Sequence, residues 1–396
     1  MNELCSATAI IPARGGSRGV PRKNVLMLAG KPMIGWTIEA AMNAETIEHV
    51  VVSTDSPEIA ETADRFGAGV VWRPAEISGD LAASEDALLH AITTMADEGR
   101  PTSDITVFLQ CTAPLMVSED IDGTVSALVQ NLAETALAVA DFHYFLWKES
   151  GQNDLVGINH DKKIRQLRQE RETNYIETGA IYVMRTQGFL QHRHRFFGKT
   201  AHYLMPPERV LEIDEPVDYR VAEVLLQERM KLSKSAALPA RIGLIVFDFD
   251  GVFTDDRVLV SEDGTESVSC SRSDGMGVRL AREAGHKMLV LSTERNPVVR
   301  QRAQKLELEV IQGTDRKAAV LSEYLTNHNI DWADVVYLGN DVNDLDCLKR
   351  AGCGVVVADA NPTAVSAANI VLSRNGGQHA IRELIDLILS SRRSDT

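Results

Sequence analysis

Three glycines and four cationic side chains lie within the segment 10–24, near the start of the chain. Glycines allow backbone N–H groups to point at one spot, and the cations surround that spot with positive charge. This combination favours binding of a polyphosphate. A solvated basic turn is the alternative, but the strand-like run before the segment and the helical pattern after it favour a phosphate-binding loop.

Two pairs of carboxylates, each spaced two residues apart, are further candidates for chemistry. Glu212 and Asp214 would share one face of a strand, because side chains alternate along a strand. Beside a triphosphate such a pair suggests Mg²⁺ ligands, whereas an exposed acidic strand end is the structural alternative. Asp248 and Asp250 come just beyond an apolar run, and a single pair of this kind is also compatible with a turn.

Three later loops carry polar side chains at the ends of strand-like runs or between them. The hydroxyls of Ser292 and Thr293 can hold a phosphoryl group during its transfer. Lys317 can neutralise the charges of a phosphate and a nucleophile, and Asn340 and Asp341 can supply oxygen ligands to a metal. Together with the aspartate pair, these loops form four motifs that follow one another along the chain. Such a combination rarely arises by chance.

The elements that must position these residues alternate along the chain. Short apolar strands alternate with amphipathic helices in both halves, which predicts largely parallel sheets covered by helices on both faces. Ser56 and Pro57 predict a helix start, and Gly67 predicts its end. The predicted strands are 50–54, 105–109, 180–184, 242–247, 287–291, 335–338 and 354–357. The predicted fold class is α/β.

The segment 231–240 separates the two halves. It is small and polar, ends in a proline and follows a predicted helix over 215–230, and a new apolar strand begins just after it. We therefore expect two domains, 1–230 and 241–396, joined by this segment as a linker.

Composition limits the classes of function. A chain of 396 residues is long for one domain, and a net charge of −15 argues against a nucleic-acid-binding surface. The five cysteines form no C-x-x-C pair, and no signal-peptide pattern is evident, which predicts reduced thiols and a cytoplasmic location. No apolar run approaches the roughly 18 residues of a membrane span.

Several blocks of the first half, in order, resemble the CMP-sialic acid synthetases, also called acylneuraminate cytidylyltransferases. These blocks are 10–24, 51–55, 73–84, 109–115, 179–182 and 212–214. The resemblance covers about residues 5 to 230. It implies a Rossmann-like nucleotidyltransferase domain that binds CTP, a nonulosonic acid and Mg²⁺.

The residue types suit cytidylyl transfer. A hydroxyl attacks the α-phosphate of CTP while pyrophosphate leaves, and positioned cations lower that barrier. We expect Arg14 and Lys23 to act as these cations and Glu212 and Asp214 to hold the metal. The resemblance implies nucleotide contacts for Gly15, Gly16, Ser17, Arg18, Asn24, Arg73 and Ser84, and sugar contacts for Gln110 and Thr178.

Two residues depart from the family pattern. Glu212 stands where the family usually has aspartate, so the metal geometry is left open. Thr178 stands where the family commonly has asparagine near the acyl-sugar site, so the identity of the sugar is left open as well.

The second half resembles the haloacid dehalogenase-like phosphatases, in particular the small capless branch that contains Kdo-8-phosphate phosphatase. In this resemblance Asp248 attacks phosphorus and Asp250 is the general acid and base, with Lys317 beside them. The implied Mg²⁺ ligands are Asp248, Asp250, Asn340 and Asp341, although the family often has aspartate at position 340. The implied substrate contacts are Thr254, Arg272, Asp274, Ser292 and Thr293.

The carboxyl-terminal segment around Gly376 and Gly377 resembles a part that reaches a neighbouring subunit in that branch, which implies a homotetramer assembled through the second domain.

Together these expectations describe a bifunctional enzyme. The first domain would activate a sialic-acid-like nonulosonate with CTP, and the second would hydrolyse a nonulosonate phosphate. The alternatives are activation of Kdo, legionaminate or pseudaminate, a second domain that only assembles the oligomer, and a regulatory nucleotide-binding module.

Overall fold

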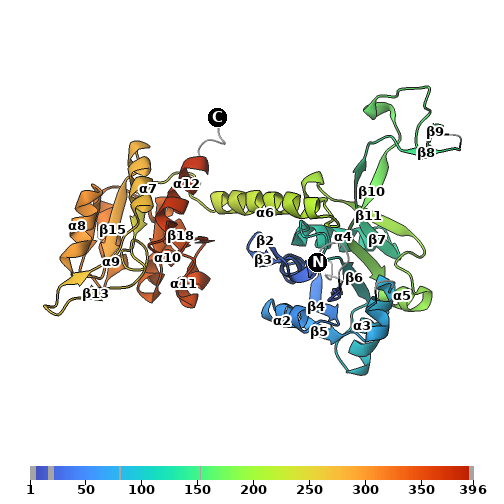
Figure 1. The fold of residues 1–396 in the computed structure, drawn as a ribbon, viewed down its shortest axis with the longest axis horizontal. Coiled ribbons are helices and arrows are strands. Elements are labelled where there is room, and N and C mark those ends of the chain that lie inside the picture. Colours follow the sequence, from blue (N-terminus) through green and yellow to red (C-terminus); the bar gives the residue numbers. More distant parts are fainter. Residues whose placement is uncertain (1–5, 17–21, 80–81, 152, 392–396) are drawn as a thin grey trace. The chain divides into compact units, whose positions relative to one another are not determined.

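The computed structural model describes residues 6–16, 22–79, 82–151 and 153–391, apart from the side chain of Arg168. The chain forms two compact units that meet in sequence at Gln227 and Glu228. Each unit has its own sheet with helices on both faces, which confirms the predicted fold class (Figure 1).

The sheet of the first unit contains seven strands among the described residues, in the order β11-β7-β10-β6-β1-β4-β5. Only β10 runs antiparallel to its neighbours, so the other strands share one direction. The strands are β1 (Ala7–Pro12), β4 (Ile47–Thr54), β5 (Gly69–Trp72), β6 (Ile105–Leu109), β7 (Thr135–Phe142), β10 (Asn174–Arg185) and β11 (Thr200–Leu204). Two short pairs accompany them, β2 (Met27–Leu28) with β3 (Lys31–Pro32) and β8 (Trp147–Glu149) with β9 (Leu155–Gly157).

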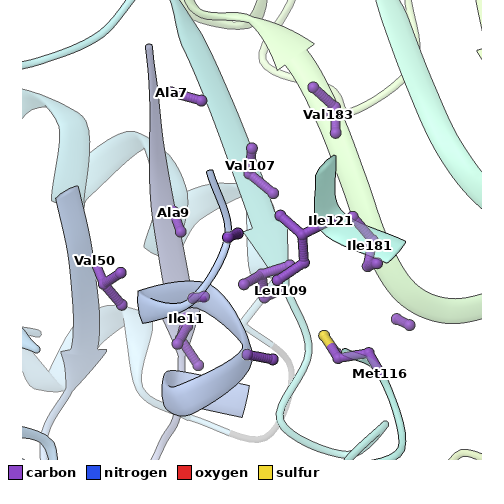
Figure 2. Close-up of a cluster of buried hydrophobic side chains, with 14 of the residues drawn as sticks. Ala7, Ala9, Ile11, Val50, Val107, Leu109, Met116, Ile121, Ile181 and Val183 are labelled. Carbon is purple, nitrogen blue, oxygen red and sulfur yellow. The ribbon is translucent and has the colours of Figure 1, made fainter. Parts of the chain in front are cut away.

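Alternation along β1 distributes its side chains between two cores. Ala9 and Ile11 belong to the core on the side of α1, α2 and α4, whereas Ile10 belongs to the core on the side of α3 and α5. Figure 2 shows the first of these cores, where Ile121 of α4 lies beside Leu109 of β6. The helices are α1 (Met33–Met42), α2 (Pro57–Arg65), α3 (Ser84–Asp97), α4 (Ser118–Gln130), α5 (Thr186–His192) and α6 (Pro216–Ala236).

The second unit contains a parallel sheet in the order β16-β15-β12-β17-β18-β19. Its strands are β12 (Leu244–Phe247), β15 (Met288–Ser292), β16 (Glu309–Gln312), β17 (Val335–Gly339), β18 (Cys353–Val356) and β19 (Ile370–Val371), and β13 (Leu259–Val260) pairs with β14 (Glu266–Ser267) outside it. One face packs on α7 (Arg272–Glu283), α8 (Pro297–Lys305) and α12 (Ala380–Ser391). The other face packs on α9 (Lys317–Asn327), α10 (Leu345–Arg350) and α11 (Pro362–Ala367).

The region between the two units differs from the linker predicted from its sequence. Helix α6 continues to Ala236, so a large part of the expected linker 231–240 is helical. Only Ala222 and Leu226 of this helix are buried, which explains why its apolar periodicity is weak near the carboxyl end. Among the described residues, no helix has the length and apolar character needed to cross a membrane.

The end of α4 generates a stability prediction. Leu132 follows the last turn with φ of 48°, and the N–H of Ala133 donates to the carbonyl of Leu128, as in a Schellman motif. This left-handed position favours glycine, and the Leu132 side chain is 84% exposed, so little packing is lost by removing it.

We expect Leu132→Gly to raise the free energy of unfolding of the first unit by about 0.5–1 kcal/mol. Leu132→Ala is the matched control, because it removes the same side chain but keeps the cost of the positive φ. Hydrogen exchange of α4 amides measures both variants, and equal protection in the two would contradict the prediction.

Candidate active sites

The candidate nucleotide site of the first unit lies at the carboxyl ends of β1 and β6, which are neighbours in the sheet. A pocket of about 310 Å³ opens there. Seven of the residues predicted from sequence line it: Arg14, Gly16, Lys23, Asn24, Ser84, Gln110 and Asp214. The positions of Ser17 and Arg18 lie outside the described residues.

Side chains and backbone hold the two ends of the loop in place. The Asn24 amide donates to the Arg14 carbonyl at 3.0 Å, and its oxygen accepts from the Cys111 thiol at 3.0 Å. The Gly15 N–H donates to Asp55 at 2.8 Å, so in this structure it points at a carboxylate. Asn24 is 8% exposed, and its visible role is to join the loop to the end of β6.

Lys23 lies against the acidic pair. Its ammonium donates to the Ile213 carbonyl at 2.6 Å and lies 3.5 Å from a carboxylate oxygen of Asp214. Asp214 lines the pocket, and its side chain is 71% exposed. A cation and an exposed carboxylate therefore face the same space.

Glu212 is the more buried member of the pair. It accepts from Gln110 at 3.3 Å and from Thr112 at 3.1 Å. Burial raises the pKa of Glu212, and the negative charge of Asp214 raises it further. A Cβ at Gly179, where φ is 70°, would lie 2.6 Å from a Glu212 oxygen, so this close approach requires glycine.

Arg73 and Thr178 lie in the protein interior. The Arg73 guanidinium donates to the Ser53 hydroxyl and carbonyl at 3.2 and 2.7 Å, and burial lowers its pKa. Thr178 is 4% exposed and donates to the Ala138 carbonyl at 2.9 Å, beside the irregularity in β10. Contacts of Arg73 with the nucleotide and of Thr178 with the sugar stay predictions.

A half-buried ion pair that no sequence pattern predicted lies beside this pocket. Arg195 donates to both oxygens of Glu85, at 2.7 and 3.2 Å, and its guanidinium lies over the rings of Phe108 and Tyr182. Phe108 lines the pocket, and Glu85 directly follows Ser84 in the first turn of α3. The basic patch around Arg195 could have suggested an ion pair, but no local pattern identifies Glu85 as its partner.

In the second unit, a buried lysine lies between two buried aspartates. The Lys317 ammonium is 2.8 Å from Asp248 and 2.8 Å from Asp344, and the three side chains are at most 5% exposed. Burial opposes the charge of Lys317, but the two carboxylates raise its pKa. Burial and Asp344 raise the pKa of Asp248, and Lys317 acts against them. Lys317 therefore offsets only part of the cost of a desolvated carboxylate at the end of β12.

Asp344 also holds the loop after β17 in place. It accepts from the Tyr337 hydroxyl at 2.6 Å and from the Asn340 N–H at 2.9 Å. These bonds tie the loop after β17 to Lys317. The metal contacts of Asp248, Asp250, Asn340 and Asp341 stay predictions.

Asp250 faces an excess of negative charge. Burial raises its pKa to about 6, and Glu294 and Asp256 contribute to the same shift. A carboxyl group with such a pKa suits proton donation and removal near neutral pH.

The donor types at this site fit a hard divalent cation. A Cβ at Gly251 would overlap the side-chain amide of Asn340, so that amide lies directly against the aspartate loop. Among the described residues, no three acidic, histidine or cysteine side chains are grouped to hold a metal. A Mg²⁺ ion would therefore need amide, carbonyl, water or phosphate oxygens as well.

Several residues predicted to contact the phosphatase substrate have internal partners. Thr254 is fully buried, and its hydroxyl accepts from the N–H groups of Gly251 and Asp256. Asp274 is also buried, and it accepts from the Arg382 N–H at 2.8 Å. Ser292 is 1% exposed, whereas Thr293, which follows it, is partly exposed. Substrate contacts of these residues stay predictions, as does that of Arg272, which lines a separate pocket described below.

Comparisons with protein families cover both halves. The family model described as cytidylyltransferase matches residues 8–236, and the model described as haloacid dehalogenase-like hydrolase matches residues 294–385. These matches confirm the order of the two predicted families. The second range does not include Asp248 and Asp250, so the roles of these residues rest on the motif and the geometry.

Individual proteins are similar to this chain over different extents. The N-acylneuraminate cytidylyltransferase of Oncorhynchus mykiss is 32% identical over 391 residues, which covers 96% of this chain and 88% of that protein. The pseudaminic acid cytidylyltransferase of Campylobacter jejuni is 30% identical over 57% of this chain and 96% of its own length. The solved structure of 3-deoxy-D-manno-octulosonate 8-phosphate phosphatase from Yersinia pestis is 29% identical, covers 41% of this chain and 87% of its own, and has a TM-score of 0.39.

The ion pair of Glu85 and Arg195 generates a pH-dependent prediction. Burial acts to raise the pKa of Glu85, but its hydrogen bonds and charge interaction with Arg195 outweigh burial and lower it. A carboxyl with a depressed pKa stabilises the fold above its unfolded-state pKa, and this contribution is lost as pH falls through its folded-state pKa.

We expect Glu85→Gln to cost about 1–3 kcal/mol of stability at pH 7, and less below pH of about 4. Hydrogen exchange of α3 peptides at both pH values measures the loss, and α9 peptides of the other unit are the internal control. A loss of protection that is the same at both pH values would contradict the assignment to an ion pair.

Proposed function

Because the chain belongs to the cytidylyltransferase family, we propose that its first unit transfers CMP from CTP to the anomeric hydroxyl of a nonulosonate. The oxygen of that hydroxyl forms a bond to the α-phosphorus, and its proton passes to water. The bond from the α-phosphorus to the bridging oxygen breaks, and pyrophosphate leaves with the electron pair. The family match, together with a pocket that holds Arg14, Lys23 and Asp214, is the observation that carries this proposal.

Three of the residues that line the pocket have a proposed task in this reaction. Arg14 and Lys23 stabilise the negative charge that develops on the phosphate oxygens. Gln110 orients the sugar, with its amide held by Glu212. Because the nucleophile belongs to the substrate, these residues need only bind, align and neutralise charge.

A divalent cation completes this proposal for the first unit. Glu212 and Asp214 would hold Mg²⁺, which supplies charge neutralisation for the leaving pyrophosphate when bound. The position of Lys23 beside Asp214 supports this, since a cation held by Asp214 and the Lys23 ammonium would both face the phosphates.

For the second unit, the proposed activity is hydrolysis of a nonulosonate phosphate. Asp248 attacks phosphorus, and Asp250 donates a proton to the leaving sugar oxygen as the phosphorus–oxygen bond breaks. Asp250 then removes a proton from a water that attacks the phosphoaspartate, which releases phosphate and restores Asp248. Lys317, placed 2.8 Å from Asp248, neutralises charge in both steps. In this unit, Mg²⁺ held by Asp248, Asp250, Asn340 and Asp341 would supply further neutralisation when bound.

The sugar is a sialic acid in the leading version of this proposal. The O. mykiss relative, whose name specifies N-acylneuraminate, aligns over nearly the whole chain, whereas the pseudaminic acid relative aligns with the first unit only. The freed sugar of the second reaction would be the substrate of the first. A homotetramer and a cytoplasmic location are parts of the proposal that rest on the sequence alone.

The first activity is tested with two neighbouring cations. Lys23 points into the pocket, whereas Arg22 is largely exposed and pairs with Glu58. We expect Lys23→Ala to lower pyrophosphate release from CTP and N-acetylneuraminate by about 10²–10³-fold. Arg22→Ala should stay within about threefold of the parent.

Equal losses in these two variants would contradict a specific role of Lys23. Pyrophosphate release with a panel of nonulosonic acids, including pseudaminate, legionaminate and Kdo, identifies the sugar. Binding of CTP without release for every sugar would favour a regulatory nucleotide-binding module.

The second activity is tested at its nucleophile. Asp248→Asn removes the attacking carboxylate, so phosphate release from N-acetylneuraminate 9-phosphate should fall by at least about 10³-fold. Pyrophosphate release by the same protein should not change, which checks that the first unit is intact. Asp263→Asn, at an exposed turn of the second unit, is the matched control and should keep full activity.

A parent protein that releases no phosphate from any sugar phosphate would instead favour a second unit that only assembles the oligomer. Removal of residues beyond Ala240 then tests that role by its effect on the oligomeric state.

A further inference from the structure

A second pocket, of about 680 Å³, lies in the second unit between the start of α7 and the loop 373–379 before α12. It is more than twice the volume of the pocket at the nucleotide site. None of the functional residues described above, apart from Arg272, lines it.

The wall of this pocket is packed against the aspartate loop of the phosphatase site. The Gly377 N–H donates to the Val252 carbonyl at 2.9 Å. A Cβ at Gly376 would overlap the carbonyl oxygen of Gly251, so these two backbone segments are in close contact. Burial raises the pKa of the Cys270 thiol on the opposite wall, and the charge of Asp250 contributes to the same shift. The pocket therefore adjoins the loop that carries Asp248 and Asp250.

The pocket is positively charged in a strongly acidic chain. Arg272, Arg374 and His379 line it, and no aspartate or glutamate does so among the described residues. Within the described ranges, neither arginine has a carboxylate partner for its guanidinium in an ion pair. Both arginines are exposed to the pocket's solvent and are available to an anion.

Three carboxylates hold the backbone of the loop that carries Arg374 and His379. Glu383 accepts from the N–H groups of Ser373 and Arg374, and Asp359 accepts from that of Gly376. Buried Asp274 accepts from the backbone at the start of α12. The loop is therefore rigidly placed, and Asp274 contributes to this pocket by positioning it.

His379 has a backbone conformation that costs free energy. Its φ is 77°, which is uncommon for residues other than glycine, and its side chain is exposed, so burial does not offset that cost.

The ring of His379 is oriented by the helix cap of α7. Its Nδ1 lies 3.3 Å from the Ser271 hydroxyl, which already accepts from the N–H groups of Ser273 and Asp274. The hydroxyl has one proton, which it can donate to Nδ1, and a neutral ring bonded in that way carries its own proton on Nε2 as a hydrogen-bond donor.

We propose that Arg272, Arg374 and His379 bind the carboxylate of a sugar-acid phosphate whose phosphate lies at Asp248. This inference rests on the proposed phosphatase function and adds the group that selects its substrate. Two guanidinium groups and an imidazole N–H are donors only, and a planar carboxylate is the anion that guanidinium groups bind in a bidentate manner. Neutral sugar phosphates lack this group and leave the donors without a partner.

Two matched probes and two variants test the proposal in the full-length protein. The probes are N-acetylneuraminate 9-phosphate and its methyl ester, which differ only in the charge of the carboxyl group. The variants are His379→Gly, which removes the ring and relieves the positive φ, and Arg374→Gln, which keeps length and polarity without charge.

For the parent we expect a KM about tenfold lower for the acid than for the ester, with kcat equal within about twofold. Each variant should lose most of this preference by raising KM for the acid alone. The melting temperature of His379→Gly should not fall, which separates loss of binding from loss of folding. Variants that keep the preference of the parent would overturn the proposal.

Failure of the phosphatase function would give a different result. If the parent hydrolyses both probes with one KM, the phosphatase activity stands and the carboxylate site is wrong. If it hydrolyses neither, calorimetric titration with the same two probes decides. A preference for the acid that both variants lose would support the site without the hydrolysis, and equal or absent binding of the two probes would overturn it.

Discussion

The parallel direction of the strands is the constraint on which both sites depend. Strands β1, β4 and β6 run together in the first unit, and β12, β15 and β17 run together in the second. Each pair of such neighbours needs a crossover element, so all of their carboxyl ends meet at one edge of the sheet. Residues far apart in sequence, such as Lys317 and Asp248, meet there because their loops leave that same edge.

Charge is placed at these edges together with its compensation. Lys23 lies between the carbonyl of Ile213 and the carboxylate of Asp214, and Lys317 lies between two carboxylates. Charged groups without such partners would pay a large desolvation cost in the interior. Where compensation is incomplete, as at Asp250, the pKa rises, and the group becomes suited to proton transfer.

The sequence predicted the strands and the motifs better than the partners of single side chains. The strand 105–109 and the helix start at Ser56 and Pro57 are as predicted, because apolar periodicity and a proline in the first turn of a helix act locally. Contacts between residues far apart in sequence leave no local pattern that predicts them. Examples are the contacts of Gly15 with Asp55 and of Arg195 with Glu85. The strain at His379 was equally hidden, since a positive φ at a residue other than glycine leaves no mark in composition.

The source of the nucleophile explains why the two sites differ in burial. In the proposed cytidylyl transfer the nucleophile arrives with the sugar, so the protein needs cations at an open pocket, and the side chain of Lys23 is 13% exposed. In the proposed hydrolysis the protein supplies the nucleophile, and its carboxylate must be fixed and kept charged before any substrate binds. That requirement accounts for Lys317 at 1% exposure and for the further hold of Asp344 on the loop after β17. A nucleophile built into the protein therefore needs a preformed, buried counter-charge, whereas a nucleophile carried by the substrate does not.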